Sequence, residues 1–317
     1  MQRVFCVFIT LLSTAVAGPA SNLEHADQAT FGLLVDGSLT GSGFIVDPSG
    51  YALTAAHQIS AAQPNLHAQS NFLGRVRLDV VALDRGRDIA LLRTRNRKTR
   101  YPFIPLATQR LSIAGSVHLL ATPNYRHNLV LSGRVARVRI GFEYFKALGH
   151  YVAVQYISAH APAGTSGGPW LNPAGQAVGM QVGLMHTGQG AKPAPAGVAY
   201  MVPANDLKAV LDSRESIERP SMRIGVEEFW EQDADYRQQF AAETTGLIVA
   251  RISKSSRAYR SGLRRGHVIH AVDGRRVSHR DDFLNFIGQK QVADRVELTL
   301  IGKNGQNRTI SVVLEGI

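Results

Sequence analysis

One serine of this chain lies in a turn built from small residues. The stretch Gly164-Thr165-Ser166-Gly167-Gly168-Pro169 places Ser166 between glycines. Glycines permit a sharp backbone bend and let a substrate carbonyl come close. A nucleophilic serine also needs backbone N–H groups aimed at the oxyanion that develops during attack. The same stretch would equally suit any tight loop, so Ser166 is a candidate nucleophile that needs partners elsewhere in the chain.

A histidine and an aspartate upstream of Ser166 supply the partners that such a serine requires. A serine nucleophile is activated by a base, and the base is oriented by a carboxylate. His57 follows a short apolar segment, and Asp88 opens the apolar run Ile89–Leu92. Taken singly, His57 is typical of a structural or exposed histidine, and Asp88 of a surface turn. Their order His, Asp, Ser along an all-β pattern favours a catalytic triad.

The elements that must position these residues are short strands. Between 30 and 200, apolar and β-branched runs alternate with Gly, Pro and Asn turns, which is the pattern of an all-β barrel fold. A short helix is expected at 205–211, after Pro203. The strands are predicted at 31–35, 43–46, 52–54, 76–83, 89–93, 116–121, 128–140, 152–158, 177–182 and 199–202.

The composition changes after a polar segment at 213–221, which is interpreted as a linker. The region 227–242 is rich in Glu, Gln, Asp and aromatic residues, which predicts a helix. A second helix is expected to begin at Ser278, because Ser278 and Asp281 fit a capping box. Strands are predicted at 247–252, 268–272, 296–301 and 309–314, so this part is expected to be a small mixed α+β domain.

The first 17 residues are predicted to be a cleavable export signal. Arg3 precedes an apolar run, and Ala15-Val16-Ala17 fits a small-residue cleavage site. The run is shorter than the ~20 residues that a membrane-spanning helix needs. Cys6 is the only cysteine and lies inside this segment. The mature protein is therefore expected to be periplasmic or secreted and to lack disulfides.

The formal net charge of +11 raises the question of an anionic partner. The basic residues are scattered, with denser regions at 85–100 and 251–265. The export signal and this scatter argue against nucleic acid. The run Arg93–Arg100 is interpreted as a solvated loop, with contact to an anionic surface as the alternative. The sequence has no metal-binding or nucleotide-binding motif, so no cofactor is expected.

The sequence resembles the HtrA/Deg family of exported trypsin-like serine proteases with a C-terminal PDZ domain. The resemblance implies a mainly β fold with a two-barrel trypsin-like protease domain at 28–212, a linker at 213–221 and a small α+β PDZ domain at 222–316. It rests on the segments Gly41–Val46, Gly50–His57, Asp88–Leu92, Gly164–Pro169, Asn172–Gly179 and Val198–Pro203.

The resemblance implies roles for individual residues. Ser166 would be the nucleophile, His57 the general base and later the acid, and Asp88 the group that orients His57. The oxyanion hole is assigned to Gly164, Thr165 and Ser166, with the N–H groups of Gly164 and Ser166 as donors. These proteases usually carry Asn or Asp where Thr165 stands. This departure is the local hint for the alternative, a peptide-binding or chaperone-like protein on a protease fold with weak or no activity.

The pocket for the substrate side chain is expected near His160 and Ala161, in the segment before Ser166. No Asp stands there to pair with a cation, so a preference for Lys or Arg is not expected. The resemblance implies small or medium aliphatic residues instead. A bolder hypothesis is that His160 lines the pocket and favours acidic or polar residues, against the simpler interpretation of an exposed loop histidine.

The second domain carries its own candidate site. Arg223-Ile224-Gly225-Val226 resembles the PDZ loop whose backbone N–H groups bind the terminal carboxylate of a peptide. A peptide would add a strand beside Val226, with specificity from the helix near 281–286. An ordinary strand start is the alternative.

The family further implies unfolded or misfolded polypeptides as substrates, and peptide C-termini as ligands that regulate the enzyme or capture substrates. Relatives also form homotrimers through N-terminal aromatic contacts. Phe31 is the only aromatic residue within 18–40 that could make such a contact.

Overall fold

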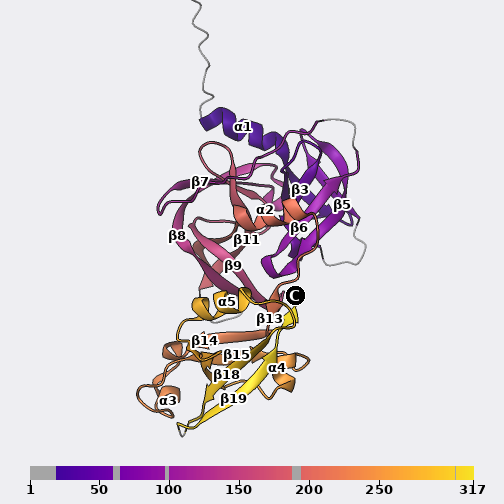
Figure 1. The fold of residues 1–317 in the computed structure, drawn as a ribbon. Helices are drawn as coiled ribbons and strands as arrows, with labels where there is room; N and C mark the ends of the chain where they lie inside the picture. Colours follow the sequence, from indigo (N-terminus) through magenta and orange to yellow (C-terminus); the bar gives the residue numbers. More distant parts are fainter. Residues whose placement is uncertain (1–18, 60–64, 97–99, 188–193, 304) are drawn as a thin grey trace, which may run out of the picture.

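The computed structural model describes residues 19–59, 65–96, 100–187, 194–303 and 305–317. The signal segment predicted at 1–17 lies outside these residues. The described chain forms two closed barrels, followed by a smaller domain of strands and short helices (Figure 1). The predicted fold class is confirmed. Within these ranges, no helix is long and apolar enough to cross a membrane.

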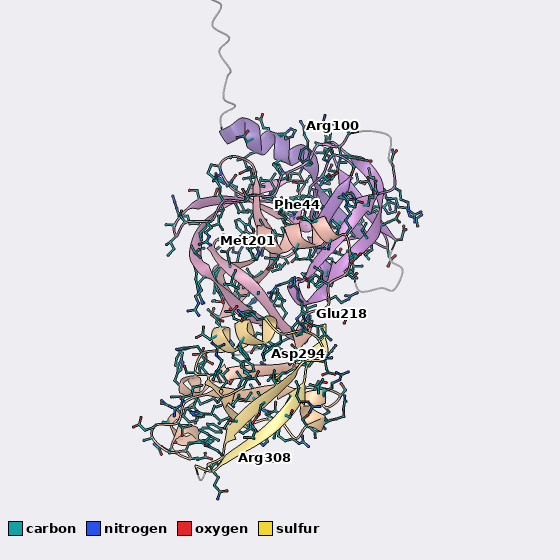
Figure 2. All side chains as sticks on the ribbon, viewed as in Figure 1. Phe44, Arg100, Met201, Glu218, Asp294 and Arg308 are labelled. Atoms are coloured by element: carbon teal, nitrogen blue, oxygen red, sulfur yellow. The ribbon has the colours of Figure 1, made fainter. Side chains whose placement is uncertain are left out.

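The first barrel closes in the strand order β1-β2-β3-β6-β5-β4. Apolar side chains fill its interior, with Phe44 fully buried (Figure 2). The sequence prediction missed β4, because Leu66-His67-Ala68-Gln69-Ser70 contains no β-branched residue. The strands are β1 (Thr30–Val35), β2 (Ser38–Ile45), β3 (Tyr51–Ala55), β4 (Leu66–Ser70), β5 (Gly74–Asp84) and β6 (Ile89–Thr94).

The second barrel closes in the order β10-β11-β12-β9-β8-β7. Trp170 and Met201 are fully buried inside it, and the Trp170 indole N–H donates to Gln181 Oε1 at 2.9 Å. The prediction missed β10, which has only three residues and begins with a proline. The strands are β7 (Ser116–Ala121), β8 (Leu129–Phe145), β9 (His150–Ser158), β10 (Pro169–Leu171), β11 (Ala177–Thr187) and β12 (Ala194–Pro203).

Short helices and turns complete the two barrels. Helix α2 (Ala204–Ser213) matches the predicted helix and buries Leu207 and Val210 against the strands. Helix α1 precedes β1 and was not predicted. The other helical elements are α1 (Pro19–Ala29) and the 3₁₀ turns η1 (Ala56–Gln58), η2 (Arg85–Arg87) and η3 (Pro123–Tyr125).

The smaller domain is built on one sheet in the order β14-β15-β16-β18-β19, with β17 paired to β16. Apart from this sheet, β13 pairs with β20. The strands are β13 (Pro220–Ser221), β14 (Ile224–Glu228), β15 (Leu247–Ile252), β16 (Val268–Val272), β17 (Arg275–Arg276), β18 (Arg295–Ile301), β19 (Asn307–Val313) and β20 (Glu315–Gly316), and the helical elements are η4 (Phe229–Glu231), α3 (Ala234–Arg237), α4 (Arg257–Arg260) and α5 (Arg280–Gly288).

Two helix predictions in this domain are wrong in part. The region 227–242 is not one helix, because Phe229 packs edge-on against Phe240 with ring centroids 5.3 Å apart and so closes a loop. Helix α5 has no capping box at Ser278. Its N-cap is His279, and the carboxylate of Glu228 accepts the Arg280 N–H at 2.9 Å instead.

The segment predicted as a linker is bonded to the first barrel. Ile217 N donates to Leu83 O at 2.9 Å, and Leu83 N donates to the Ser216 hydroxyl at 3.1 Å. Arg219 pairs with the buried Asp84 at 2.7 Å. These contacts hold the segment against the first barrel, while the predicted domain limits stay predictions.

Two surface predictions are altered by the side chains of the first barrel. Phe31 is 0% exposed and packs in the barrel core, so it offers no contact to a second subunit. In the basic run at 93–100, the Arg93 guanidinium lies 4.7 Å from the Tyr51 ring centre, and Arg95 pairs with Asp79 at 2.7 Å. Residues 97–99 lie outside the described chain.

Candidate active site

Strand pairing brings His57 and Asp88 together. Strands β3 and β6 are neighbours in which Ala55 lies opposite Ile89. His57 follows the end of β3 within η1, and Asp88 directly precedes β6. The two side chains therefore meet: His57 Nδ1 lies 2.6 Å from Asp88 Oδ2, and Asp88 Oδ1 accepts the His57 backbone N–H at 2.7 Å.

This contact defines the tautomer of His57. Asp88 is 0% exposed, and its carboxylate can only accept hydrogen bonds. Nδ1–H of His57 therefore donates to Asp88, and Nε2 of the neutral ring is left as an acceptor. A ring held in this state is suited to take a proton from a nearby hydroxyl.

The turn that presents Asp88 is held by a second carboxylate. Asp84 accepts the Arg87 N–H at 3.0 Å and so caps η2. Asp84 also accepts two hydrogen bonds from the Arg219 guanidinium, at 2.9 and 2.7 Å. Asp84 is fully buried. The segment that leads to the smaller domain is thus joined to the loop that carries Asp88.

Ser166 lies in a turn that is clasped by strand β2 of the other barrel. Ser42 N donates to Ser166 O at 2.8 Å, and the Ser42 hydroxyl donates to Gly164 O at 3.1 Å. Gly167 has φ +88°, and a Cβ there would lie 2.0 Å from Ser42 O. Only glycine fits this position, because both the left-handed backbone and the close approach exclude a side chain.

The N–H groups around Ser166 separate into used and unused donors. Thr165 N and the Thr165 hydroxyl both donate to Pro162 O, at 3.3 and 2.8 Å. The assignment of Thr165 to the oxyanion hole is therefore corrected, since its amide is engaged within the turn. Within the described chain, the N–H groups of Gly164 and Ser166 have no hydrogen-bond partner. These two donors are available to an oxyanion.

The ring of His57 is bonded to a residue that was not predicted. Gln58 Nε2 lies 2.8 Å from His57 Nε2. Across the described residues, no hydrogen bond joins the Ser166 hydroxyl to His57. The sequence offered no signal for Gln58, because a polar residue after a histidine is common in any turn.

A cavity of about 550 Å³ opens beside the pair of His57 and Asp88. Its size falls within the ~300–1,000 Å³ typical of ligand pockets. Both domains line it, with His150 from the second barrel and Arg223 and Ile317 from the smaller domain. Burial lowers the pKa of His150, which favours the neutral form of its ring. Arg223, predicted to assist peptide binding, thus faces the candidate active site.

The residues predicted to line the substrate pocket are placed differently from one another. His160 is exposed, as the simpler interpretation has it. Ala161 is 2% exposed and belongs with Trp170 to the apolar core of the second barrel, and its assignment to the pocket stays a prediction. In the described part of the chain, no group of His, Cys, Asp or Glu side chains is placed to hold a metal ion.

The predicted peptide-binding strand of the smaller domain meets the second barrel. Ile224 and Val226 in β14 are buried. The hydroxyl of Tyr151, from β9, donates to Val226 O at 2.7 Å and accepts the Val226 N–H at 2.9 Å. Burial raises the pKa of Tyr151 to about 12, so the hydroxyl keeps its proton. The strand edge beside Val226 is therefore occupied.

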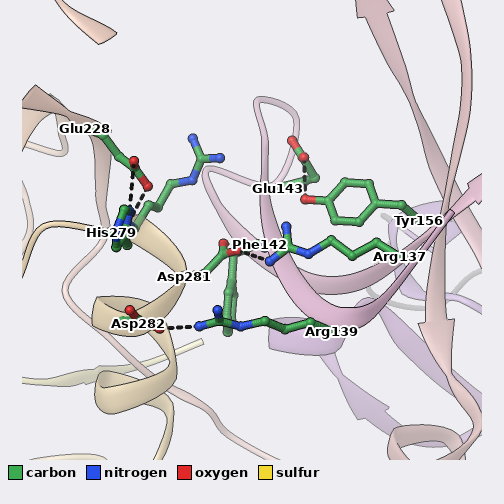
Figure 3. A network of polar contacts seen from close by, with 10 residues as sticks. Arg137, Arg139, Phe142, Glu143, Tyr156, Glu228, His279, Asp281 and Asp282 are labelled. Atoms are coloured by element: carbon green, nitrogen blue, oxygen red, sulfur yellow. Dashed lines mark hydrogen bonds and ion pairs between the residues drawn. The ribbon is translucent and has the colours of Figure 1, made fainter. Parts of the chain in front are cut away.

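Ion pairs hold helix α5 to the hairpin that β8 forms with β9, the strand of Tyr151 (Figure 3). Arg137 pairs with Asp281 at 2.6 Å, and Arg139 pairs with Asp282. Asp281 also accepts the Phe142 N–H at 3.2 Å. The space left between β14, α5 and the hairpin is only about 60 Å³. The groove that a peptide would need is filled by the chain itself.

A half-buried carboxylate, that of Glu143, lies near these ion pairs. Glu143 accepts the Tyr156 hydroxyl hydrogen bond at 2.9 Å (Figure 3), and burial raises the pKa of Glu143. Arg280 of α5 is close enough to oppose that rise through its charge. The contact between the domains therefore combines tightly packed, hydrogen-bonded and charged groups.

Comparison with known proteins places both domains. Residues 41–180 match the trypsin-like peptidase domain family, and residues 234–314 match the PDZ domain family. A trypsin-like peptidase domain followed by a PDZ domain supports the resemblance to the HtrA/Deg family. The matched ranges contain His57, Asp88 and Ser166 in the first domain and α5 in the second.

Individual relatives agree with this family. Serine protease HhoA of Synechocystis sp. is 27% identical over 82% of this chain and 67% of its own length. A DegP-like periplasmic serine endoprotease of Marinomonas sp. is 24% identical over 88% of this chain. The chain spans only 57% of that relative's length.

Solved structures of serine proteases share the fold. HtrA-type protease AlgW with a decapeptide superimposes with a TM-score of 0.68 at 17% identity, covering 95% of this chain and 99% of AlgW. The serine endoprotease of Yersinia pestis gives a TM-score of 0.63 at 19% identity, covering 95% of this chain and 98% of its own.

Proposed function

We propose that the protein is an exported serine endopeptidase that hydrolyses peptide bonds of unfolded or misfolded polypeptides. The observation that carries the proposal is the bond from His57 Nδ1 to the buried Asp88. It is supported by two unpaired N–H groups at Gly164 and Ser166. Base, orienting carboxylate and oxyanion donors are the parts that acyl transfer needs.

In this proposal the steps follow from the donors and acceptors. The Ser166 hydroxyl attacks the substrate carbonyl while His57 Nε2 accepts its proton, and the imidazolium then gives that proton to the leaving amine. Asp88 stabilises the imidazolium without taking the proton itself. The N–H groups of Gly164 and Ser166 bind the oxyanion, and each such donor stabilises the transition state by about 3 kcal/mol. Water then attacks the acyl group on Ser166 while His57 accepts its proton, and His57 returns that proton to Ser166 as the acyl group leaves.

The peptidase proposal is tested by labelling with a fluorophosphonate probe and by digestion of casein. Wild type should be labelled and active, whereas Ser166→Ala should lose both. Ser132→Ala is the matched control, because Ser132 is an exposed serine on β8 outside the site. The unbonded Ser166 hydroxyl favours one rival function, a peptide-binding or chaperone-like protein. Wild type that is neither labelled nor active, with or without added C-terminal peptides, would favour that rival.

For the second domain we propose that Arg223, Ile224, Gly225 and Val226 bind peptide C-termini. A peptide can add a strand to β14 only if the Tyr151 hydroxyl leaves Val226. Peptide binding and docking of the two domains would therefore exclude each other. Tyr151→Phe removes both hydrogen bonds and should tighten binding of a fluorescent C-terminal peptide by about fivefold. Tyr125→Phe, an exposed tyrosine, is the control.

The location and assembly of the protein complete the proposal. We place it in the periplasm, because the DegP-like relatives carry that location in their names and residues 1–17 have the composition of a signal. Cell fractionation of the full chain checks this. A homotrimer stays a prediction without Phe31 as its contact, and light scattering of the purified protein measures the mass.

A further inference from the structure

The side chain of Gln58 occupies the atom of His57 on which catalysis depends. Gln58 Nε2 lies 2.8 Å from His57 Nε2. In the neutral ring, the form that can act as a base, Nδ1–H donates to Asp88 at 2.6 Å, so Nε2 carries no proton and can only accept. The Gln58 amide group must therefore present its N–H₂ side as the donor.

One lone pair decides what the ring can do next. The neutral imidazole has a single acceptor position at Nε2. A hydrogen bond from Gln58 uses that position, so the Ser166 hydroxyl cannot donate to it at the same time. This agrees with the lack of any hydrogen bond between the Ser166 side chain and His57 in the described residues.

The amide of Gln58 also lies between the two halves of the site. A Cβ placed on Gly41 would be 2.9 Å from Gln58 Cδ and 2.8 Å from Ser166 O. The side chain of Gln58 thus runs over Gly41, next to the turn that carries Ser166. Gly41 leaves the room for it, since any side chain at this position would meet both groups.

We propose that Gln58 is a positioning residue that holds the enzyme in a resting state by bonding His57 Nε2 in place of Ser166. The inference rests on the proposed peptidase function. A substrate or probe at the site must displace the Gln58 amide before Ser166 can transfer its proton. Gln58 is half-buried and is the last residue of a 3₁₀ turn of three residues. Rotation about its own side-chain bonds can therefore move the amide away while the His57 ring stays in place.

The test compares two substitutions that break the contact in different ways. Gln58→Leu keeps the bulk and removes the donor, and Gln58→Asn keeps the amide but is one methylene shorter. Gln306→Leu is the matched control, because Gln306 is an exposed glutamine in the PDZ domain. The rate of fluorophosphonate labelling of Ser166 is measured for the full chain, with thermal unfolding to show that each variant is folded.

We expect both Gln58 variants to be labelled about three- to tenfold faster than wild type, the factor that corresponds to one net hydrogen bond. Peptide hydrolysis should show the gain in kcat with KM nearly unchanged. The ¹⁵N signal of His57 Nε2, recorded in the Ser166→Ala background, should move toward that of an unbonded imine nitrogen in Gln58→Leu. The Nδ1–H signal should stay, because Asp88 is untouched.

The possible failures are distinguishable. Equal or slower labelling in folded Gln58→Leu and Gln58→Asn overturns the role of Gln58 and leaves the peptidase proposal standing. An unchanged Nε2 signal in Gln58→Leu overturns the hydrogen bond itself. A shifted signal without labelling of wild type or either variant supports the hydrogen bond and overturns the peptidase function on which its role depends.

Discussion

The two halves of the candidate active site are built in opposite ways. In the first barrel, both carboxylate oxygens of Asp88 and both ring nitrogens of His57 have hydrogen-bond partners. In the second barrel, the N–H groups of Gly164 and Ser166 and the Ser166 hydroxyl have none among the described residues. One half is saturated and the other is open.

The difference follows from the function proposed for each half, which is the base in the first barrel and the oxyanion donors in the second. The base must be held in one tautomer before substrate arrives, so its bonds are made within the protein. The oxyanion exists only during the reaction, so the groups that stabilise it must be unpaired at rest. We therefore expect changes in the first half to act through lost bonds, and changes in the second half to act through lost shape.

The largest effect is expected from Asp88→Asn. The amide can donate to His57 Nδ1 and so favours the wrong tautomer, which should lower kcat by about 10³- to 10⁴-fold with little change in KM. Peptide hydrolysis and probe labelling measure the loss. Asp79→Asn breaks an exposed ion pair with Arg95 and should leave the rate unchanged. A loss of kcat below tenfold in Asp88→Asn would mean that the pair of His57 and Asp88 does not supply the general base.

The next largest effect is expected from Arg219→Met, which acts on the support of this half. The substitution leaves the buried Asp84 carboxylate without its cation, and we expect a loss of about 2–4 kcal/mol in the free energy of unfolding. Arg95→Met breaks a pair whose side chains are 49% exposed and should cost about 1 kcal/mol or less. Urea unfolding compares the two. Equal losses would show that the buried clamp adds nothing.

Gly167→Ala probes the shape of the open half. The new Cβ would meet Ser42 O at 2.0 Å in a backbone with φ +88°, and we expect about 2–3 kcal/mol of destabilisation together with loss of probe labelling. Gly37→Ala is the control, because Gly37 has φ +86° and nothing within 4 Å of a Cβ. The difference between the two variants isolates the contact from the backbone strain. No difference would remove the argument from shape.

The smallest effect is a pH dependence from His150, which lies between the halves and the PDZ domain. Its pKa is lowered by burial, with Asp88 and Asp84 opposing the shift and Arg223 adding to it. The neutral ring is favoured in the folded protein, so its contribution to stability is present above about 6.5 and is lost as the pH falls through its lowered pKa. His150→Gln should make the melting temperature depend less on pH over this range, whereas His127→Gln, at an exposed position, should not. Parallel curves for wild type and His150→Gln would contradict this.

The sequence predicts the barrels and the contexts of the triad because these depend on local patterns. The strands at Ser116–Ala121, Leu247–Ile252 and Val268–Val272 have the bounds predicted, since each is an apolar run between turn residues. The pairing of His57 with Asp88 follows once their strands are neighbours in one barrel.

Contacts between distant segments could not be predicted from such patterns. The aromatic residues in 227–242 fit a helix, but Phe229 and Phe240 pack on each other across a loop instead. The bonds of Tyr151 to Val226 and of Arg219 to Asp84 join segments far apart in sequence. The bond of Gln58 to His57 is local but depends on a rotamer, which no sequence pattern specifies.

The clasp of Ser42 on the Ser166 turn has a consequence for the biogenesis of the enzyme. Ser42 belongs to the first barrel, and Gly164 and Ser166 to the second, so their hydrogen bonds form only when both barrels are complete. Synthesis proceeds from the N-terminus, so a nascent chain carries His57 and Asp88 before Ser166 has been made. The turn that carries Ser166 can therefore be clasped by Ser42 only after the second barrel has joined the first.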